Sequence, residues 1–143
     1  SRGHVHINST DPDALPDLVT NYRDTDADRQ SMIGAVRKAR ALVKQKPLSD
    51  YIEVETMPGP AYETDDEILS AYDKYGTCGY HAVGSCRMGK DPATSVVDPE
   101  LRVRGTTGLR IMDTSIMPAI PSGNTNGPTM AMAWRAADII MRG

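Results

Sequence analysis

The chain has 143 residues, enough for a domain with a modest core, and 16 basic against 19 acidic side chains give a net charge of -3. This balance argues against nucleic acid as a partner, because a general polyanion-binding surface needs an excess of positive charge. The longest uncharged run, residues 114–134, is interrupted by prolines, glycines and asparagines, so we expect no membrane span. The first residues lack the basic and then apolar pattern of a signal peptide, and we expect a soluble, cytoplasmic protein.

Patterns in the first half of the chain predict a strand, a helix and a second strand. Residues 4–8 alternate polar and apolar side chains, which is typical of a half-buried strand. Apolar side chains recur at helical spacing over residues 25–45, with charged side chains on the other face, and predict a surface helix. Residues 51–55 alternate again and predict another strand.

Three further elements are predicted in the second half. Thr64 and Glu67 have the spacing of a capping box and predict a short helix that ends at about Tyr72. Residues 101–103 and 109–112 are predicted to form a hairpin, because a glycine-containing turn separates them. Pro128 suits the first turn of a helix, which we expect to end at about Met141. That helix is apolar on nearly every face, so we expect it to lie inside a larger structure.

Histidines and cysteines give weak signals of chemistry by themselves. His81 is one of 3 histidines and could move a proton near neutral pH, but a histidine that is hydrogen-bonded in a turn is the commoner case. His4 and His6 share one face of the first strand, yet no acidic or sulfur ligand lies at a spacing that completes a metal site. Cys78 and Cys86 are eight positions apart, so we expect thiols and neither a zinc site nor a disulfide.

The loop at residues 122–127 leads directly into the last predicted helix. Its backbone N–H groups would point out of the helix start, where negative charge is favoured. Asn and Gly are also typical of a plain capping loop, and the loop alone does not decide between the two. No G-x-S-x-G motif marks a serine nucleophile.

Four stretches in order are far more specific than any of these features alone. They are YHAVGSCRMG, VVDPELRVRG, GLRIMDTSIMP and PSGNTNGPTMAMAWRAADII. Together they resemble the C-terminal segment of the glucose-methanol-choline (GMC) family of flavin-dependent oxidoreductases. The opening SRGHVHINSTDP resembles the start of the same region, so the resemblance covers essentially the whole chain.

The resemblance implies an α+β fold. Residues 1–75 would belong to the substrate-binding region, with an antiparallel sheet and helices. Residues 76–143 would contain the catalytic histidine segment and the strands and helix that complete the FAD-binding region.

The same resemblance implies oxidation of a small-molecule alcohol with FAD as the cofactor. His81 matches the family histidine that takes the hydroxyl proton or holds the alkoxide. Asn124 matches the second active-site position, which is histidine in the glucose oxidase and aryl-alcohol oxidase branch and asparagine in the choline and cholesterol oxidase branches. An amide can hydrogen-bond the substrate oxygen but cannot take its proton, so the base role falls on His81.

Four more positions match family residues near the flavin. Asp113 and Thr114 match a segment that contacts FAD, partly through backbone groups. Thr125 and Asn126 would lie at the start of the last helix beside the flavin's N1 and C2 carbonyl.

The chain departs from the family pattern at one point, because it contains no G-x-G-x-x-G motif. We therefore expect it to be the C-terminal third or so of a longer enzyme, inactive by itself and dependent on the N-terminal FAD-binding part. The alternative is a catalytically silent module that keeps this fold to bind a partner.

Overall fold

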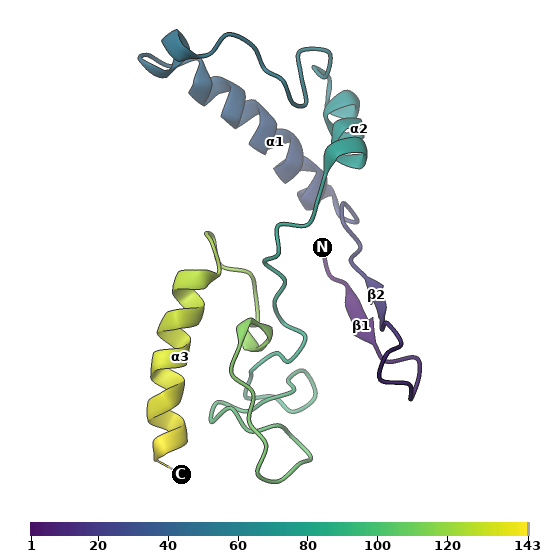
Figure 1. The fold of residues 1–143 in the computed structure, drawn as a ribbon, viewed down its shortest axis with the longest axis vertical. Helices are drawn as coiled ribbons and strands as arrows, with labels where there is room; N and C mark the ends of the chain where they lie inside the picture. Colours follow the sequence, from purple (N-terminus) through teal and green to yellow (C-terminus); the bar gives the residue numbers. More distant parts are fainter. Residues whose placement is uncertain (143) are drawn as a thin grey trace. The chain divides into compact units, whose positions relative to one another are not determined.

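The computed structural model describes residues 1–142, which form two compact units, residues 1–77 and residues 78–142. Within these residues the fold is α+β, with short strands and three α-helices (Figure 1). The elements in chain order are β1 (His4–His6), β2 (Asp17–Val19), α1 (Asp26–Val43), the 3-10 helix η1 (Leu48–Tyr51), α2 (Asp65–Tyr75), the 3-10 helix η2 (Thr114–Ile116) and α3 (Asn126–Met141).

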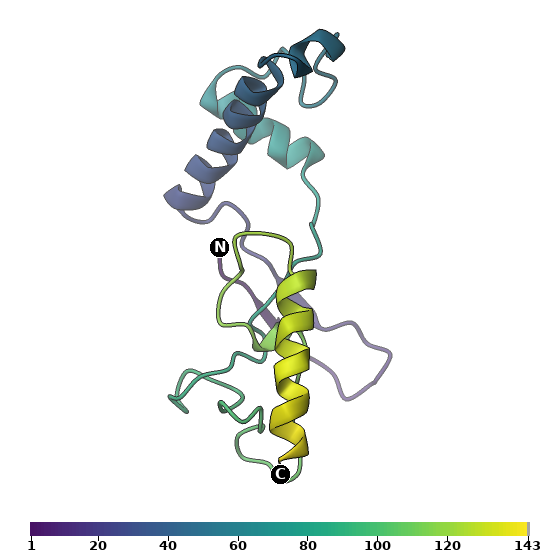
Figure 2. The ribbon, with the colours of Figure 1, turned by 90° about the vertical axis from the view of Figure 1, so that its left-hand side faces the viewer.

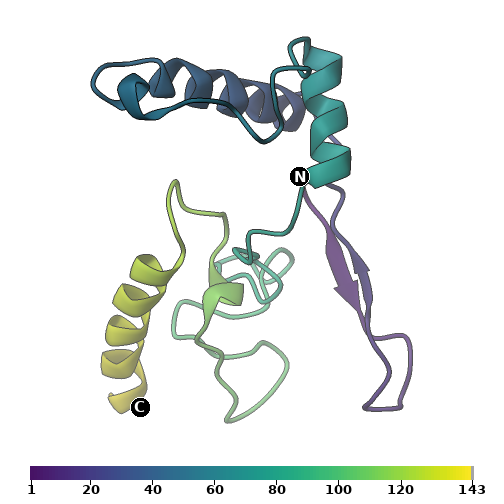
Figure 3. The same cartoon turned by 45° about the horizontal axis from the view of Figure 1, so that its top comes forward.

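Strands β1 and β2 form an antiparallel pair in which Val5 lies opposite Leu18 (Figure 3). The predicted first strand is confirmed, although it is shorter than residues 4–8, and β2 was not predicted. Both Val5 and Leu18 are exposed. Because an isolated pair of strands is only marginally stable in water, this hairpin needs further packing to be secure.

Both helices of the first unit begin with a capping box. The Thr25 hydroxyl accepts a hydrogen bond from the N–H of Asp28 at 3.1 Å, and the Asp28 carboxylate accepts one from the N–H of Thr25 at 3.1 Å. At the start of α2, Glu67 accepts from the N–H of Thr64 at 2.8 Å and Thr64 accepts in return. The two helix predictions are confirmed, since these boxes satisfy N–H groups that the helix itself leaves free.

Helices α1 and α2 pack together through a small apolar contact (Figure 2). Its buried members are Ile33 on α1 and Ile68 and Ala71 on α2. The Tyr72 hydroxyl donates a hydrogen bond to the carbonyl oxygen of Met32 at 3.3 Å. Ile33, in the apolar stripe predicted for α1, is therefore buried, whereas Leu42 near the end of the helix is 63% exposed.

The strand predicted at residues 51–55 is wrong. Tyr51 ends η1, and residues 52–56 have no strand structure. The physical reason is an ion pair: Glu55 receives two hydrogen bonds from Arg40, at 2.8 and 2.7 Å. Arg40 also donates to the carbonyls of Gly59 and Tyr62, so α1 holds this segment as a loop.

The second unit has its own core, in which α3 packs against the segment that contains η2 (Figure 1). Val97, Leu101, Ile116 and Ala136 are its buried members. Helix α3 ends at Met141 as predicted and begins at Asn126, so that Pro128 lies in its first turn.

The predicted hairpin is present as isolated bridges and not as regular strands. The N–H of Val103 donates to Leu109 at 3.0 Å, and the N–H of Ile111 donates to Leu101 at 3.1 Å. Gly105 in the turn has a φ of 74°, in the left-handed region that favours glycine. The two predicted segments do pair, through the bridge between Arg102 and Arg110, but the pairing is too short for a ladder.

Three structural observations concern membranes, metals and disulfides. No helix within residues 1–142 is long and apolar enough to cross a membrane. In the same part of the chain, no group of three or more His, Cys, Asp and Glu residues is arranged to hold a metal ion. Neither Cys78 nor Cys86 forms a disulfide.

Candidate active site

The second unit contains all the site residues that the sequence indicated, on three of its segments. One segment follows α2, one surrounds η2, and one leads into α3. In chain order these residues are His81, Asp113, Thr114, Asn124, Thr125 and Asn126.

The segment that contains His81 is attached to η2 by backbone hydrogen bonds. The N–H of Cys86 donates to the carbonyl of Ser115 at 3.1 Å, and the N–H of Met88 donates to that of Ile116 at 2.9 Å. Gly84 has a φ of 89°, and a side chain there would lie 3.4 Å from the carbonyl oxygen of Met117. That distance is an ordinary contact, so it is the positive φ of the turn that favours glycine here.

His81 itself lies in an irregular stretch with an exposed side chain. The preceding residue, Tyr80, has a positive φ of 57°, and its N–H donates to Cys78 Sγ at 3.3 Å. Non-glycine residues in this region are uncommon and often lie at functional sites. The structure shows no hydrogen bond from the His81 ring to any residue in 1–142, so the ring is open to a ligand.

Asp113 has a structural role that the sequence did not reveal. Its carboxylate accepts a hydrogen bond from the N–H of Ser115 at 2.7 Å and so caps η2. Thr114, the first residue of η2, is half-buried. Contact between either residue and a cofactor stays a prediction.

Ser115 is a candidate that sequence reasoning missed. Its hydroxyl is buried and has no hydrogen-bond partner among the described residues. Leaving a buried polar group unsatisfied costs about 1–3 kcal/mol. A water molecule or a group from outside the described residues can supply the missing hydrogen bond. No local pattern in the sequence could show this, since the burial comes from tertiary packing.

The start of α3 is built to face negative charge. Thr125, the residue before the helix, is only 7% exposed, and its carbonyl accepts from the N–H and the hydroxyl of Thr129 at 2.9 and 2.7 Å. No side chain caps this end. The N–H groups of Asn126 and Gly127 have no acceptors within the helix, and they lie at the positive end of its dipole.

Asn124 precedes Thr125 and has an exposed side chain. Within residues 1–142, no hydrogen bond joins Asn124 to His81. The two side chains are in the same compact unit, and both are accessible to a ligand. A direct catalytic pairing between them stays a prediction.

Comparison with known proteins shows the family of this chain. A family model described as GMC oxidoreductase matches residues 1–133. The chain belongs to the GMC oxidoreductase family. The resemblance to the C-terminal region of that family is thereby confirmed, and so is the α+β fold that it implied.

Two curated relatives and one solved structure illustrate this membership. The chain is 43% identical over 142 residues to alcohol dehydrogenase [acceptor] of Pseudomonas putida, covering 99% of this chain and 26% of that protein. It is 44% identical over 144 residues to oxygen-dependent choline dehydrogenase of Staphylococcus saprophyticus, covering 98% and 25%. A FAD-dependent oxidoreductase from Chaetomium thermophilum matches with a TM-score of 0.85 and 29% identity, covering 99% and 25%.

The chain spans about a quarter of the length of each of these proteins. The GMC family is one of FAD-dependent oxidoreductases whose members oxidise alcohols.

Proposed function

We propose that this chain is the C-terminal part of a FAD-dependent enzyme that oxidises an alcohol at its CH–OH group. Family membership supports the reaction class. The observation that supports this chain's role most is the position of His81. Its side chain is exposed on a segment that two backbone hydrogen bonds hold against η2, and η2 shares a core with α3.

The residues present fit a flavin. The positive start of α3, with Thr125 and Asn126, suits the part of the flavin where negative charge develops. The unsatisfied hydroxyl of Ser115, next to Thr114, offers a hydrogen bond to a group that these 142 residues do not supply. Asp113 fixes the backbone of this segment by capping η2. FAD, when bound, supplies the acceptor for the hydride that leaves the alcohol carbon.

His81 and Asn124 divide the work on the substrate hydroxyl. An imidazole nitrogen of His81 accepts the hydroxyl proton, because imidazole is basic enough at neutral pH and this ring makes no competing hydrogen bond within residues 1–142. The Asn124 amide donates a hydrogen bond to the same oxygen as negative charge develops on it.

Two finer assignments belong to the proposal. Asn124 and the relatives named choline dehydrogenase support a choline-like branch of the family. Residues 1–75 would contribute to the substrate-binding region and residues 76–143 to the FAD-binding region. The N-terminal part with the glycine motif would be the partner, so the isolated chain would be inactive.

The test is alcohol oxidation by the complete flavoenzyme with His81→Ala, and with Ser85→Ala as an exposed control on the same segment. Loss of a general base typically lowers turnover by about 100-fold or more. We expect that loss with His81→Ala, with unchanged flavin content, and near-normal turnover with Ser85→Ala. Near-normal turnover of the His81→Ala variant would show that His81 is not the general base.

A further inference from the structure

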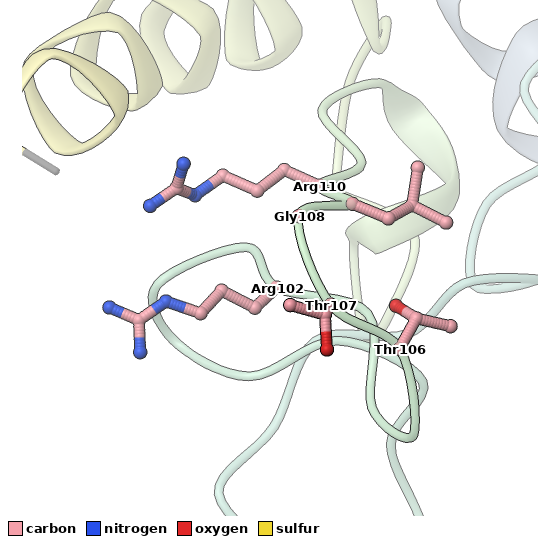
Figure 4. A pocket seen from close by; sticks show the side chains of 6 residues that line it. Arg102, Thr106, Thr107, Gly108 and Arg110 are labelled. Carbon is pink, nitrogen blue, oxygen red and sulfur yellow. The ribbon is translucent and has the colours of Figure 1, made fainter.

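The hairpin turn of the second unit forms a pocket that the proposed reaction does not use. Its volume is about 290 Å³, and Figure 4 shows the side chains around it. The lining residues are Arg102, Thr106, Thr107, Gly108, Leu109 and Arg110.

Arg102 and Arg110 lie directly opposite each other across an antiparallel bridge. Like charges in this relationship destabilise a strand pair, and guanidinium groups stay charged at all ordinary pH values. Both side chains extend in the same direction from the hairpin in Figure 4. The arrangement therefore concentrates two positive charges at one pocket.

The described residues offer no carboxylate partner to these two charges. Arg110 Nε donates to the carbonyl of Glu100 at 3.3 Å. Within residues 1–142, no carboxylate forms an ion pair with Arg102 or Arg110. Arg40, in contrast, binds Glu55 at 2.7 Å. An external anion would relieve the repulsion between the two arginines.

The backbone of the pocket is held in place by its own contacts. The Thr106 hydroxyl donates to the carbonyl of Val103 at 2.9 Å, and the N–H of Val103 donates to Leu109 at 3.0 Å. Gly105 and Gly108 both have a φ of 74°, which gives the turn its shape. A fixed turn keeps the two arginines in one register, so that both can reach the same ligand.

We propose that Arg102 and Arg110 form a binding site for an oxyanion, the shared chemistry of a phosphate group and a carboxylate. The planar fork of each guanidinium matches two oxygens of such a group. The anion has two sources to distinguish: a diffusible phosphate, or a carboxylate side chain from a part of the polypeptide outside these 143 residues. This site is separate from the residues assigned to alcohol oxidation and does not depend on that assignment.

The experiment titrates inorganic phosphate against the 143-residue chain and against the complete polypeptide that contains it, by calorimetry at constant ionic strength. The variants are Arg102→Gln and Arg110→Gln, which remove the charge. A third variant, Arg102→Lys, keeps the positive charge but lacks the planar guanidinium. Lys90→Gln is the matched control, because it removes one positive charge from an exposed position of the same unit outside the pocket. The melting temperature of each variant is measured alongside.

We expect phosphate to bind the chain, and each glutamine variant to weaken binding by at least about tenfold, the usual scale of a charge-assisted hydrogen bond. Arg102→Lys should weaken binding as well, and Lys90→Gln should not. In a second outcome, the complete polypeptide binds no phosphate, while Arg102→Gln and Arg110→Gln lower its melting temperature and Lys90→Gln does not. That result would show that a carboxylate of the polypeptide itself occupies the site. Phosphate affinities and melting temperatures that are equal in Arg102→Gln, Arg110→Gln and Lys90→Gln would overturn the proposal.

Discussion

The backbone N–H of Met88 donates a hydrogen bond to the carbonyl oxygen of Ile116 at 2.9 Å. Together with the bond from Cys86 to Ser115, it fixes the segment that follows His81 along η2. Ile116 is 1% exposed and packs in the same cluster as Ala136 of α3. Ile116 thus contacts the segment that follows His81 through its backbone carbonyl, and it shares the core with α3 through its side chain.

Ile116→Ala should destabilise the protein by about 2–5 kcal/mol, the usual cost of removing a buried aliphatic side chain and leaving a cavity. The matched control is Ile120→Ala, because Ile120 is 63% exposed and should change stability by less than about 0.5 kcal/mol. Urea unfolding measures both. Equal effects of the two variants would contradict the assignment of Ile116 to the core.

Arg40→Ala should lower the free energy of unfolding by about 1–3 kcal/mol, since it removes hydrogen bonds to a carboxylate and to two carbonyls. The arginine is partly exposed, and solvent screening limits the loss. Arg37→Ala serves as the control because, within residues 1–142, Arg37 pairs with the exposed Asp65 on the surface and with no other carboxylate. A loss with Arg37→Ala as large as that with Arg40→Ala would contradict the special role of Arg40.

The same ion pair predicts a dependence of stability on pH. The hydrogen bond from Arg40 is the largest of the effects that hold the pKa of Glu55 below its ordinary value; burial opposes it, and the positive charge of Arg40 and the N–H of Gly59 add to it. A lowered pKa in the folded state stabilises the fold above the unfolded pKa of about 4.3, and the contribution is lost as pH falls through the folded pKa. Glu55→Gln should therefore cost stability near neutral pH and less in acid. A cost that stays constant across that range would contradict this account.

Asn124→Ala in the complete enzyme should lower kcat by roughly 100-fold, as losing one donor to a developing oxyanion does. The Ser122→Ala variant changes another exposed residue of the same loop and should leave kcat unchanged. Steady-state kinetics with the flavin content measured for each protein separates the two. Normal kcat with Asn124→Ala would show that the amide does not contact the reacting oxygen.

Helices α1 and α2 could be predicted from the sequence because their determinants are local. The Thr64 and Glu67 pair is visible at a fixed spacing, and it forms the capping box in the structure. The prediction of a strand at residues 51–55 was wrong because the determinants of this segment are not local. A strand needs a partner, and Glu55 is instead held by Arg40, a contact across 15 positions that no local pattern reveals.

In the candidate site, too, local motifs could be read from the sequence and features that depend on tertiary packing could not. His81 and the start of α3 were found through ordered motifs, and the structure places them in one unit. The buried hydroxyl of Ser115 and the cap formed by Asp113 depend on how η2 packs, so the sequence offered no signal for them.

The most direct test of the central claim is complementation. The 143-residue chain, with and without His81→Ala, is mixed with a polypeptide that supplies the glycine motif of the FAD-binding part, and alcohol oxidation is measured together with retained flavin. The account predicts flavin retention with both chains and oxidation only with the unchanged one. Equal oxidation with both would contradict the role of His81, and stable assembly without oxidation would show a silent binding module in place of an enzyme part.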